Sequence, residues 1–330
     1  MPSTGASQVK RVVTFCAHQP YLYLFKGMNW RLDLIQLKEQ KRFLQNWRES
    51  VRPLPQGWRL VDLDQAKRDL AAGRYDLAIA HNINDYIDFL PFNLPRVLVM
   101  HTSLHSRFAE EQTDVAPEEY RAQFYSLITK TKGALVFVSE HKRRDWDLPG
   151  VVIPLVVSLE HYRGYTGEKP AILRVSNHLV ERGEILDYPA HQRLSDGLPL
   201  TLIGENPSLA DADVAESWDA LRAAYRQHRL YLHTAKPGLE DGYNTAMLEA
   251  MATGMPVVST AHPTSPIRDG VNGFVSDDLD ELRRNVERLL GDRELAAKLG
   301  ANARKTVAAK FASDRFHKAW RKVLKHLTKK

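Results

Sequence analysis

The stretch YLHTAKPGLEDGYNTAMLEAMATGMPVVST, residues 231–260, has the pattern of a strand, a loop, a helix and a second strand. Glycine and proline interrupt the apolar run at its start. Residues 245–252 are rich in Ala, Met, Leu and Glu, which are good helix formers. Gly254 ends this helix and Pro256 cannot continue it, and the valines that follow predict a buried strand. The chain is therefore expected to contain strand–helix–strand units.

Two acidic residues belong to this unit, Asp241 in the loop and Glu249 on the helix. The loop DGYN presents backbone N–H groups at a helix N-terminus, and such groups suit phosphate or sugar oxygens. Glu249 lies one turn beyond Thr245 on the same helix face, so its carboxylate can accept hydrogen bonds from vicinal hydroxyls in the same space. The alternative interpretation is a capped helix start with a solvated glutamate.

The segment DGYNTAMLEAMATGMPVVST resembles the nucleotide-binding signature of GT-B retaining glycosyltransferases, especially glycosyltransferase family 4. The matching residues are Asp241, Gly242, Tyr243, Glu249, Ala250, Gly254, Pro256, Val257 and Val258. Two positions depart from the family. Its first acid is usually Glu where this chain has Asp241, and the preceding Glu240 is an alternative source of the longer carboxylate. Its second glycine is here Asn244, a residue that tolerates positive φ better than most.

Composition sets the class of protein. The chain has 330 residues, of which 43% are hydrophobic, enough for two domains with sizeable cores. The single cysteine, Cys16, excludes a disulfide framework and a cysteine zinc cluster, and indicates a reducing compartment. No apolar run approaches the roughly 20 residues of a membrane span, and the start MPSTGASQVK lacks the apolar core of a signal peptide. We therefore expect a cytoplasmic protein. The net charge of +6 favours anionic partners without choosing among them.

Six segments in the first half of the chain predict buried strands. They are residues 12–17, 58–62, 77–81, 96–101, 135–139 and 151–154. Residues 34–51 are expected to form a helix with a buried stripe that includes Leu37, Phe43 and Trp47, and prolines end it. Strands that alternate with helical segments indicate βαβ units and a mainly parallel sheet, and hence an α/β fold.

Further segments extend the resemblance over most of the chain. PRVLVMHTSLH is similar to the family's strand that ends in a histidine at the cleft, here His101, and VVIPLVVSLEHY is similar to its interdomain linker. AILRVSNHLVERGE resembles the strand and basic segment that hold the donor diphosphate, with Arg182 at the family's Lys position. A fixed guanidinium there can bind a leaving phosphate bidentately.

The resemblance implies two Rossmann-like domains facing a cleft, the GT-B fold. Residues 1–154 would form an acceptor-side domain, and residues 155–330 would form the domain that binds the nucleotide sugar. In such folds the final helix crosses back onto the first domain, and the segment from Ala301 to Lys330 is helical in pattern and basic.

The implied activity is transfer of a sugar, with retention, from a nucleotide-sugar donor to a glycan, lipid-linked or small-molecule acceptor, as in polysaccharide biosynthesis. The resemblance assigns one role to each candidate site residue. Arg182 would neutralise the diphosphate, Glu249 would hold the ribose hydroxyls, Asp241 with the N–H groups of Gly242, Tyr243, Asn244 and Thr245 would hold the sugar hydroxyls and the β-phosphate, and His101 would lie near the anomeric carbon. Retaining members of this fold need no cofactor, metal or protein nucleophile, so catalysis would depend on positioning and phosphate stabilisation.

Two other functions stay open at this point. One is a sugar-nucleotide 2-epimerase of the same fold. The other is a relative that binds a nucleotide or sugar without turnover, a hypothesis motivated by Asp241, Asn244 and the short segment ADADVAES. That segment replaces a helix, a strand and a glycine turn that often frame the nucleobase in the family, so the donor is less certain than the fold.

Several other sequence patterns do not indicate a metal, nucleotide or nucleic-acid site. Asp-x-Asp pairs, which bind a metal in GT-A glycosyltransferases, occur at four scattered places that helix caps or surface loops explain. No His/Glu spacing indicates zinc, and there is no Walker loop or Gly-x-Gly-x-x-Gly. The basic residues are not part of a recognisable nucleic-acid fold, so no nucleic-acid partner is expected.

Lys26 lies among aromatic residues, and more lysines and arginines follow in the same domain. The aromatic residues are Tyr21, Tyr23, Phe25 and Trp30, and the further cations are Lys130, Lys132, Lys142, Arg143 and Arg144. One hypothesis is peripheral docking on the inner face of an anionic membrane, with the rings at headgroup depth. The other is a charged soluble surface above core aromatics.

Overall fold

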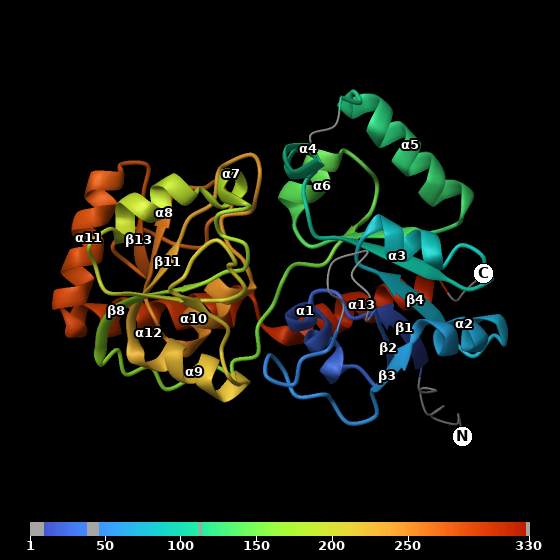
Figure 1. Ribbon diagram of the computed structural model, residues 1–330, viewed down its shortest axis with the longest axis horizontal. Helices are drawn as coiled ribbons and strands as arrows, with labels where there is room; N and C mark the ends of the chain where they lie inside the picture. The colour runs from blue at the N-terminus through green and yellow to red at the C-terminus, as the bar shows by residue number, and fades with distance from the viewer. Residues whose placement is uncertain (1–9, 38–45, 112–113, 328–330) are drawn as a thin grey trace, which may run out of the picture. The chain divides into compact units, whose positions relative to one another are not determined.

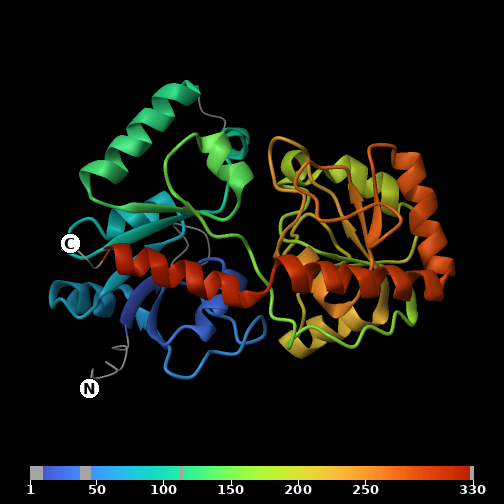
Figure 2. The ribbon, with the colours of Figure 1, turned by 180° about the vertical axis from the view of Figure 1, so that it is seen from behind.

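The computed structural model describes residues 10–37, 46–111 and 114–327, and the chain divides into two α/β units (Figures 1 and 2). The first unit consists of Met1–His101, Val115–Ile153 and His317–Lys330. The second consists of Thr102–Asp114 and Pro154–Phe316. Among the described residues, no helix is both long and apolar enough to cross a lipid bilayer.

The first unit is built on a seven-stranded parallel sheet with the order β3-β2-β1-β4-β5-β6-β7. Its strands are β1 (Lys10–Phe15), β2 (Trp30–Gln36), β3 (Arg59–Asp62), β4 (Leu77–Ala80), β5 (Arg96–Met100), β6 (Ala134–Phe137) and β7 (Val151–Val152). Its helices are α1 (Gln19–Tyr23), the 3₁₀ helix η1 (Leu24–Gly27), α2 (Leu63–Ala71), α3 (Ile83–Asp88), α5 (Pro117–Lys130), α6 (Glu140–Trp146) and most of α13 (Ser313–Leu327). The central strands β4 and β5 are buried along their whole length, as expected of parallel strands covered on both faces.

The prediction of a helix over residues 34–51 is wrong in the parts that the structure describes. Leu34 and Ile35 lie in β2, which pairs with β1 and β3, and Trp47 lies outside any helix or strand. Residues 38–45, which include Phe43, lie outside the described residues. A short apolar run has no periodicity that separates a buried strand from a buried helix, so β2 was missed.

The aromatic residues around Lys26 form part of the core of the first unit. Phe25 packs edge-on against Trp320 of α13, with ring centroids 5.0 Å apart, and stacks on Trp30 at 5.1 Å. All four aromatic residues around Lys26 are buried: Tyr21, Tyr23, Phe25 and Trp30. These rings are therefore not available at headgroup depth, and the hypothesis of core aromatics is the one that the structure supports.

The second unit is built on a six-stranded parallel sheet with the order β10-β9-β8-β11-β12-β13. Its strands are β8 (Lys169–Val175), β9 (Leu200–Ile203), β10 (Ala212–Asp213), β11 (His228–His233), β12 (Val257–Thr260) and β13 (Gly273–Ser276). Its helices are α4 (Leu104–Glu111), α7 (Gly183–Leu186), α8 (Tyr188–Ser195), α9 (Trp218–Gln227), α10 (Thr245–Thr253), α11 (Leu279–Gly291) and α12 (Arg293–Lys310). The segment ADADVAES contributes the two-residue edge strand β10.

Helix α10 is the centre of the second unit. All of its residues from Met247 to Thr253 are buried, because it packs on α9 and α12 as well as on the sheet. Gly254 ends α10 with φ 96°, a left-handed conformation that favours glycine. On α12, a Cβ at Gly300 would meet the carbonyl oxygen of Gly254, so this glycine permits the close approach of the two helices.

Candidate functional site

The predicted donor residues lie at the carboxyl edge of the second sheet. Strand β8 has β9 on one side and β11 on the other. The chain first adds strands on one side of β8 and then on the other, so the strand order reverses between β8 and β11. In open α/β sheets ligands bind at such a switch point, outside the carboxyl ends of the strands. The segment after β8 contains Arg182, and the segment after β11 contains residues 241–245. The topology therefore brings these two predicted groups to one end of the sheet.

Asn244 caps α10 rather than supplying a left-handed turn. Its backbone is extended, with φ −138° and ψ 178°, and its Oδ1 accepts a hydrogen bond from the Met247 backbone N–H at 2.9 Å. The tolerance of asparagine for positive φ is therefore not used at this position. An asparagine here satisfies one of the N–H groups that a helix start leaves without an intrahelical partner. Helix α10 begins at the half-buried Thr245, so its N-terminus lies at the switch point.

Gly242 is needed because His262 lies against its Cα. A Cβ built at Gly242 would come within 2.6–2.9 Å of His262 side-chain atoms. The Gly242 N–H donates to Thr264 Oγ1 at 2.8 Å, and the same Oγ1 lies 3.0 Å from His262 Nδ1. Thr264 and His262, from the segment after β12, thus fix the backbone of the acidic loop.

Two carboxylates lie next to each other at the start of this loop. Asp241 is only 1% exposed, and its backbone N–H donates to Glu240 Oε1 at 3.0 Å. Glu240 Oε2 lies 3.8 Å from Arg182 Nη2, and Arg182 Nε donates to Glu110 Oε1 of α4 at 3.0 Å. The Arg182 guanidinium therefore contacts Glu110 and faces Glu240, whereas Asp241 is buried.

Two serines bind the backbone of Leu239, the residue before Glu240 and Asp241. Ser106 lies in α4, and Ser103 directly precedes this helix. Ser103 Oγ donates to the Leu239 carbonyl oxygen at 2.8 Å, and Ser106 Oγ donates to the same oxygen. Both serines are buried. The acidic loop is thus fixed at Leu239 as well as at Gly242.

Glu249 is a buried carboxylate, so the alternative of a solvated glutamate is wrong. It is 4% exposed, and its Oε2 accepts a hydrogen bond from the Tyr225 hydroxyl of α9 at 3.1 Å. This bond fixes the orientation of the carboxylate. Tyr243, by contrast, packs its ring against Phe311 with centroids 5.2 Å apart, an apolar contact that anchors the loop.

In the first unit, His101 belongs to a cluster of imidazole rings at the carboxyl edge of the sheet. His81 follows β4 directly, His101 follows β5, and His81 Nδ1 lies 2.9 Å from His101 Nε2. His18, after β1, stacks on His101 with centroids 4.1 Å apart, and its backbone is left-handed, with φ 50° and ψ 55°. Tyr21 of α1 lies edge-on to His101 at 4.9 Å. The switch point of this sheet falls between β1 and β4.

Burial lowers the pKa values of His81 and His101 well below the usual range, and the neighbouring His18 lowers both further. Both rings are therefore neutral at pH 7. The same direction holds for His233 at the end of β11, where burial and then Arg174 lower the pKa. Across the described residues, no group of three or more His, Cys, Asp or Glu side chains is arranged to hold a metal ion.

Four residues of the site were not predicted from the sequence: His81, Tyr225, His262 and Thr264. A signal for His81 was present, since it is the last residue of a predicted strand just as His101 is, and the carboxyl ends of parallel strands share one edge. Tyr225, His262 and Thr264 reach the site only through tertiary packing, so no local pattern marks them.

The chain is similar to known proteins in one segment of its sequence and in its fold. Residues 191–292, just under a third of the chain, match the family model described as "Glycosyl transferases group 1". No curated protein matches the sequence.

Several solved structures are similar over most of the chain. Anabaena Alr3699/HepE in complex with UDP and glucose has a TM-score of 0.69 at 14% identity, covering 96% of this chain and all of that chain. WaaG, a glycosyltransferase involved in lipopolysaccharide biosynthesis, has a TM-score of 0.61 at 13% identity and covers 96% and 100%. A variant of S. aureus TarM in complex with fondaparinux, alpha-GlcNAc-glycerol and UDP has a TM-score of 0.57 at 15% identity and covers 75% and 55%.

The present chain therefore spans about half the length of the TarM chain. At these identities the likeness is one of fold, and it confirms the prediction of two Rossmann-like α/β domains. Residues 191–292 thus match a group 1 glycosyltransferase model, within a chain that has the fold of the GT-B glycosyltransferases.

Proposed function

We propose that the protein is a retaining glycosyltransferase that moves a sugar from a nucleotide-sugar donor to a glycan, a lipid-linked or a small-molecule acceptor. One observation carries the proposal. The hydrogen-bonded loop from Asp241 to Thr245 leads into the buried helix α10 at the switch point of the second sheet, with the Glu249 carboxylate one turn further on. This arrangement lies within the segment that matches the glycosyltransferase model.

Each part of the arrangement suits one part of a nucleotide sugar. N–H groups at a helix N-terminus bind phosphate oxygens. A buried carboxylate held by Tyr225 can accept hydrogen bonds from the two ribose hydroxyls, and its desolvation makes such charge-assisted bonds strong. Asp241 would hold hydroxyls of the transferred sugar.

Arg182 would stabilise the leaving diphosphate. Its guanidinium contacts Glu110 and faces Glu240, so a diphosphate would replace or share these carboxylate contacts. Charge that develops on the leaving phosphate would then meet a guanidinium that is already oriented, which is where electrostatic catalysis is most effective.

The first unit would supply His101. We propose that its neutral imidazole hydrogen-bonds the transferred sugar, as in the resembled family, and that His18, His81 and Tyr21 hold it in place. No metal or organic cofactor is part of the proposal, so activity should survive excess chelator.

A thermal-shift screen across nucleotides and nucleotide sugars tests the proposal, beginning with UDP and UDP-sugars because HepE and TarM were solved with UDP. Stabilisation by one nucleotide family, followed by transfer to an acceptor with the anomeric configuration retained by NMR, is the expected result. Failure of every nucleotide to bind would overturn it.

Two other outcomes identify the alternatives. Incorporation of deuterium at C2 of the donor sugar in deuterated water would show an epimerase. Tight nucleotide binding by calorimetry, with neither hydrolysis nor transfer in any acceptor mixture, would show a binding protein without turnover.

A further inference from the structure

Four arginine side chains and one aspartate share a face of the first sheet, near its amino edge. In the parallel register, Arg11 pairs with Arg31 on the neighbouring strand, and Asp33 pairs with Arg59. Residues two apart on a strand point to the same face, so Arg31 and Asp33 do so as well. Arg74, in the turn before β4, joins them. This edge of the sheet is opposite to the carboxyl edge at which His81 and His101 lie.

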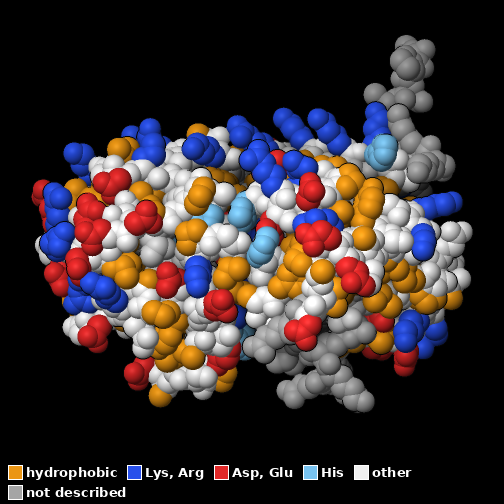
Figure 3. Space-filling model, turned by 90° about the horizontal axis from the view of Figure 1, so that it is seen from above, with side chains coloured by type: hydrophobic (Ala, Val, Ile, Leu, Met, Phe, Trp, Pro, Cys, Tyr) orange, Lys and Arg blue, Asp and Glu red, His pale blue; other side chains and the backbone are white. Residues whose placement is uncertain are grey.

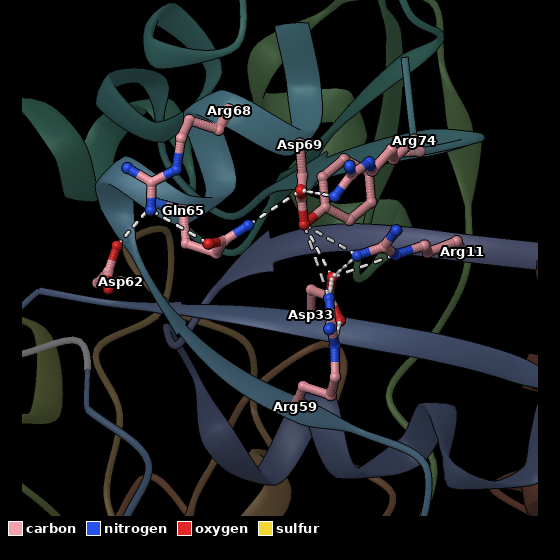
Figure 4. A network of polar contacts seen from close by, with 9 residues as sticks. Arg11, Asp33, Arg59, Asp62, Gln65, Arg68, Asp69 and Arg74 are labelled. Atoms are coloured by element: carbon pink, nitrogen blue, oxygen red, sulfur yellow. Dashed lines mark hydrogen bonds and ion pairs between the residues drawn. The ribbon is translucent and has the colours of Figure 1, made fainter. Parts of the chain in front are cut away.

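Two buried carboxylates fix three of these guanidinium groups (Figure 4). Asp33, with a side chain 1% exposed, accepts hydrogen bonds from Arg11 Nη2 at 2.9 Å, from Arg59 Nε at 2.8 Å and from the Tyr75 hydroxyl at 2.8 Å. Asp69 of α2, 3% exposed, accepts from Arg11 Nη2 at 3.0 Å and from Arg74 Nη1 at 2.7 Å.

Both carboxylates stay ionised in this setting. Burial acts to raise the pKa of Asp33, but hydrogen bonds from Arg59, Tyr75 and Arg11 outweigh it, and the pKa is lowered. The pKa of Asp69 is lowered in the same way, with Gln65 and Arg74 opposing burial. Arg11 is held further by the Tyr75 ring, whose centroid lies 4.8 Å from the guanidinium carbon. The guanidinium groups of Arg11, Arg59 and Arg74 are therefore oriented before any ligand arrives.

Positive charge exceeds negative charge in this cluster of arginines and aspartates. Four guanidinium groups face two carboxylates, which leaves two positive charges. Each guanidinium has five N–H donors, and the two carboxylates engage Arg59 through Nε and Nη2 and Arg74 through Nη1. Arg31 is exposed, and in the described part of the chain it makes no ion pair or side-chain hydrogen bond. Donors therefore remain for a ligand.

These side chains line a surface hollow of about 280 Å³ whose wall consists of Arg11, Arg31, Asp33, Gly57, Arg59 and Arg74. One water molecule takes up about 30 Å³ in the liquid, so the hollow has room for a tetrahedral oxyanion. Over the face shown in Figure 3, basic side chains line the upper margin, and below it basic and acidic side chains are interspersed. Fixed guanidinium groups around a hollow are thus a more specific feature than the net positive charge of the chain.

We propose that this hollow binds a phosphate group. Guanidinium forks match phosphate oxygens in geometry and bind them bidentately, and two excess positive charges match a phosphate dianion. The group comes either from a soluble phosphate compound or from a phospholipid headgroup, since both present the same oxygens. The site is separate from the candidate donor site, which lies in the second unit, and it does not depend on the proposed transferase activity.

Calorimetric titration with inorganic phosphate at constant ionic strength tests the soluble source. Arg31→Gln is the informative variant, because Arg31 stabilises neither buried carboxylate and its loss should leave the fold intact. Its phosphate affinity should fall about tenfold, the effect of losing one charge-assisted contact, and Arg31→Lys should lose less. Arg321→Gln, the same charge change on an exposed residue of α13, should bind as the wild type does.

Co-sedimentation with mixed phosphatidylcholine and phosphatidic acid vesicles tests the lipid source, with pure phosphatidylcholine as the neutral control. Binding that requires phosphatidic acid and is lost in Arg31→Gln but kept in Arg321→Gln assigns the site to a headgroup. Arg31-dependent binding of inorganic phosphate without vesicle binding assigns it to a soluble compound. Binding of neither probe, or equal losses in the two variants, overturns the proposal.

Discussion

His81 Nδ1 lies 2.9 Å from His101 Nε2; His81 is buried, His101 is half-buried, and both rings are neutral at pH 7. A neutral imidazole has one N–H, so one ring donates and the other accepts. The second nitrogen of His81, Nε2, is buried and has no hydrogen-bond partner among the described residues. A buried N–H without a partner is less tolerable than a buried acceptor. The favoured assignment is therefore a His81 Nδ1–H that donates to His101 Nε2, and His101 then has its own proton on Nδ1.

This relationship predicts that His81 positions His101. In His81→Leu the tautomer and ring orientation of His101 are no longer fixed, and sugar transfer should slow by about tenfold to a hundredfold, the cost of a misplaced group. Nucleotide affinity should not change, because the nucleotide is proposed to bind the second unit. Steady-state kinetics with a parallel nucleotide titration measures both.

His81→Asn provides the matched control, since its side-chain amide can place an N–H near the former Nδ1. Partial recovery of the rate relative to His81→Leu supports a positioning role. If both variants transfer sugar as fast as the wild type, His81 has no role beyond packing.

The second prediction concerns Glu249. Glu249→Ala should weaken nucleotide binding by about 1.5–3 kcal/mol, because a pair of charge-assisted hydrogen bonds to the ribose is lost. Tyr225→Phe removes only the hydroxyl that orients the carboxylate, so its loss should be smaller. Titration calorimetry with the nucleotide found in the screen measures both, and Glu287→Ala on the exposed face of α11 is the control. Unchanged affinity in Glu249→Ala would rule out the ribose assignment.

The third prediction concerns Gly242. A methyl group there meets His262 at 2.6 Å, so Gly242→Ala should displace the acidic loop and destabilise the protein by about 1–3 kcal/mol, the usual effect of overpacking. Donor binding should weaken with it. Gly291→Ala is the matched control, since nothing lies within 4 Å of the added carbon, and its stability should equal or exceed that of the wild type. Urea denaturation of both variants compares them directly.

The fourth prediction follows from the cap on α10. Asn244→Ala should lower the free energy of unfolding by about 1 kcal/mol, whereas Asn244→Gly should cost only a few tenths, because glycine is tolerated at this position of a helix. Asn244→Asp keeps the accepting oxygen and should be close to the wild type. A large gain in stability for the glycine variant would instead indicate that the residue is strained, contrary to its extended backbone.

Much of the fold follows from sequence patterns, because buried parallel strands are short apolar runs bounded by turn residues. In the first sheet, the strands predicted at residues 77–81 and 96–101 correspond to β4 and β5. Strand β2 was not predicted, since its run LDLIQL continues into a segment with helical spacing. The two-residue strand β10 is also too short to be recognised from composition.

The candidate site was predictable only where its residues are contiguous. The loop from Asp241 to Thr245 and Glu249 form one local motif, and the structure places them together at the start of α10. Whether Glu249 is solvated depends on Tyr225, which comes from another helix, and the partners of Arg182 come from α4 and from the loop itself. Burial and pairing of this kind arise from tertiary packing, which single-sequence patterns do not encode.

The fifth prediction concerns pH. His191 on α8 is buried, and burial, assisted by the nearby Arg174, lowers its pKa to about 3. In the unfolded chain a histidine has a pKa of about 6.5. Below that pH the unfolded state binds a proton that the folded state does not, so the stabilisation is complete above pH 6.5 and declines as the pH falls.

Between about pH 7.5 and about pH 5.5, one such group should lower the free energy of unfolding by about 1.4 kcal/mol. His81, His101 and His233 act in the same direction, so the wild type should lose several times this amount. His191→Leu keeps the packing but cannot bind a proton, and its loss over the same interval should be smaller by about 1.4 kcal/mol. His326→Gln, an exposed control, should follow the wild type. Urea denaturation at the two pH values measures the free energy of unfolding of each variant. An equal loss in His191→Leu and in the wild type would show that His191 is protonated in the folded protein.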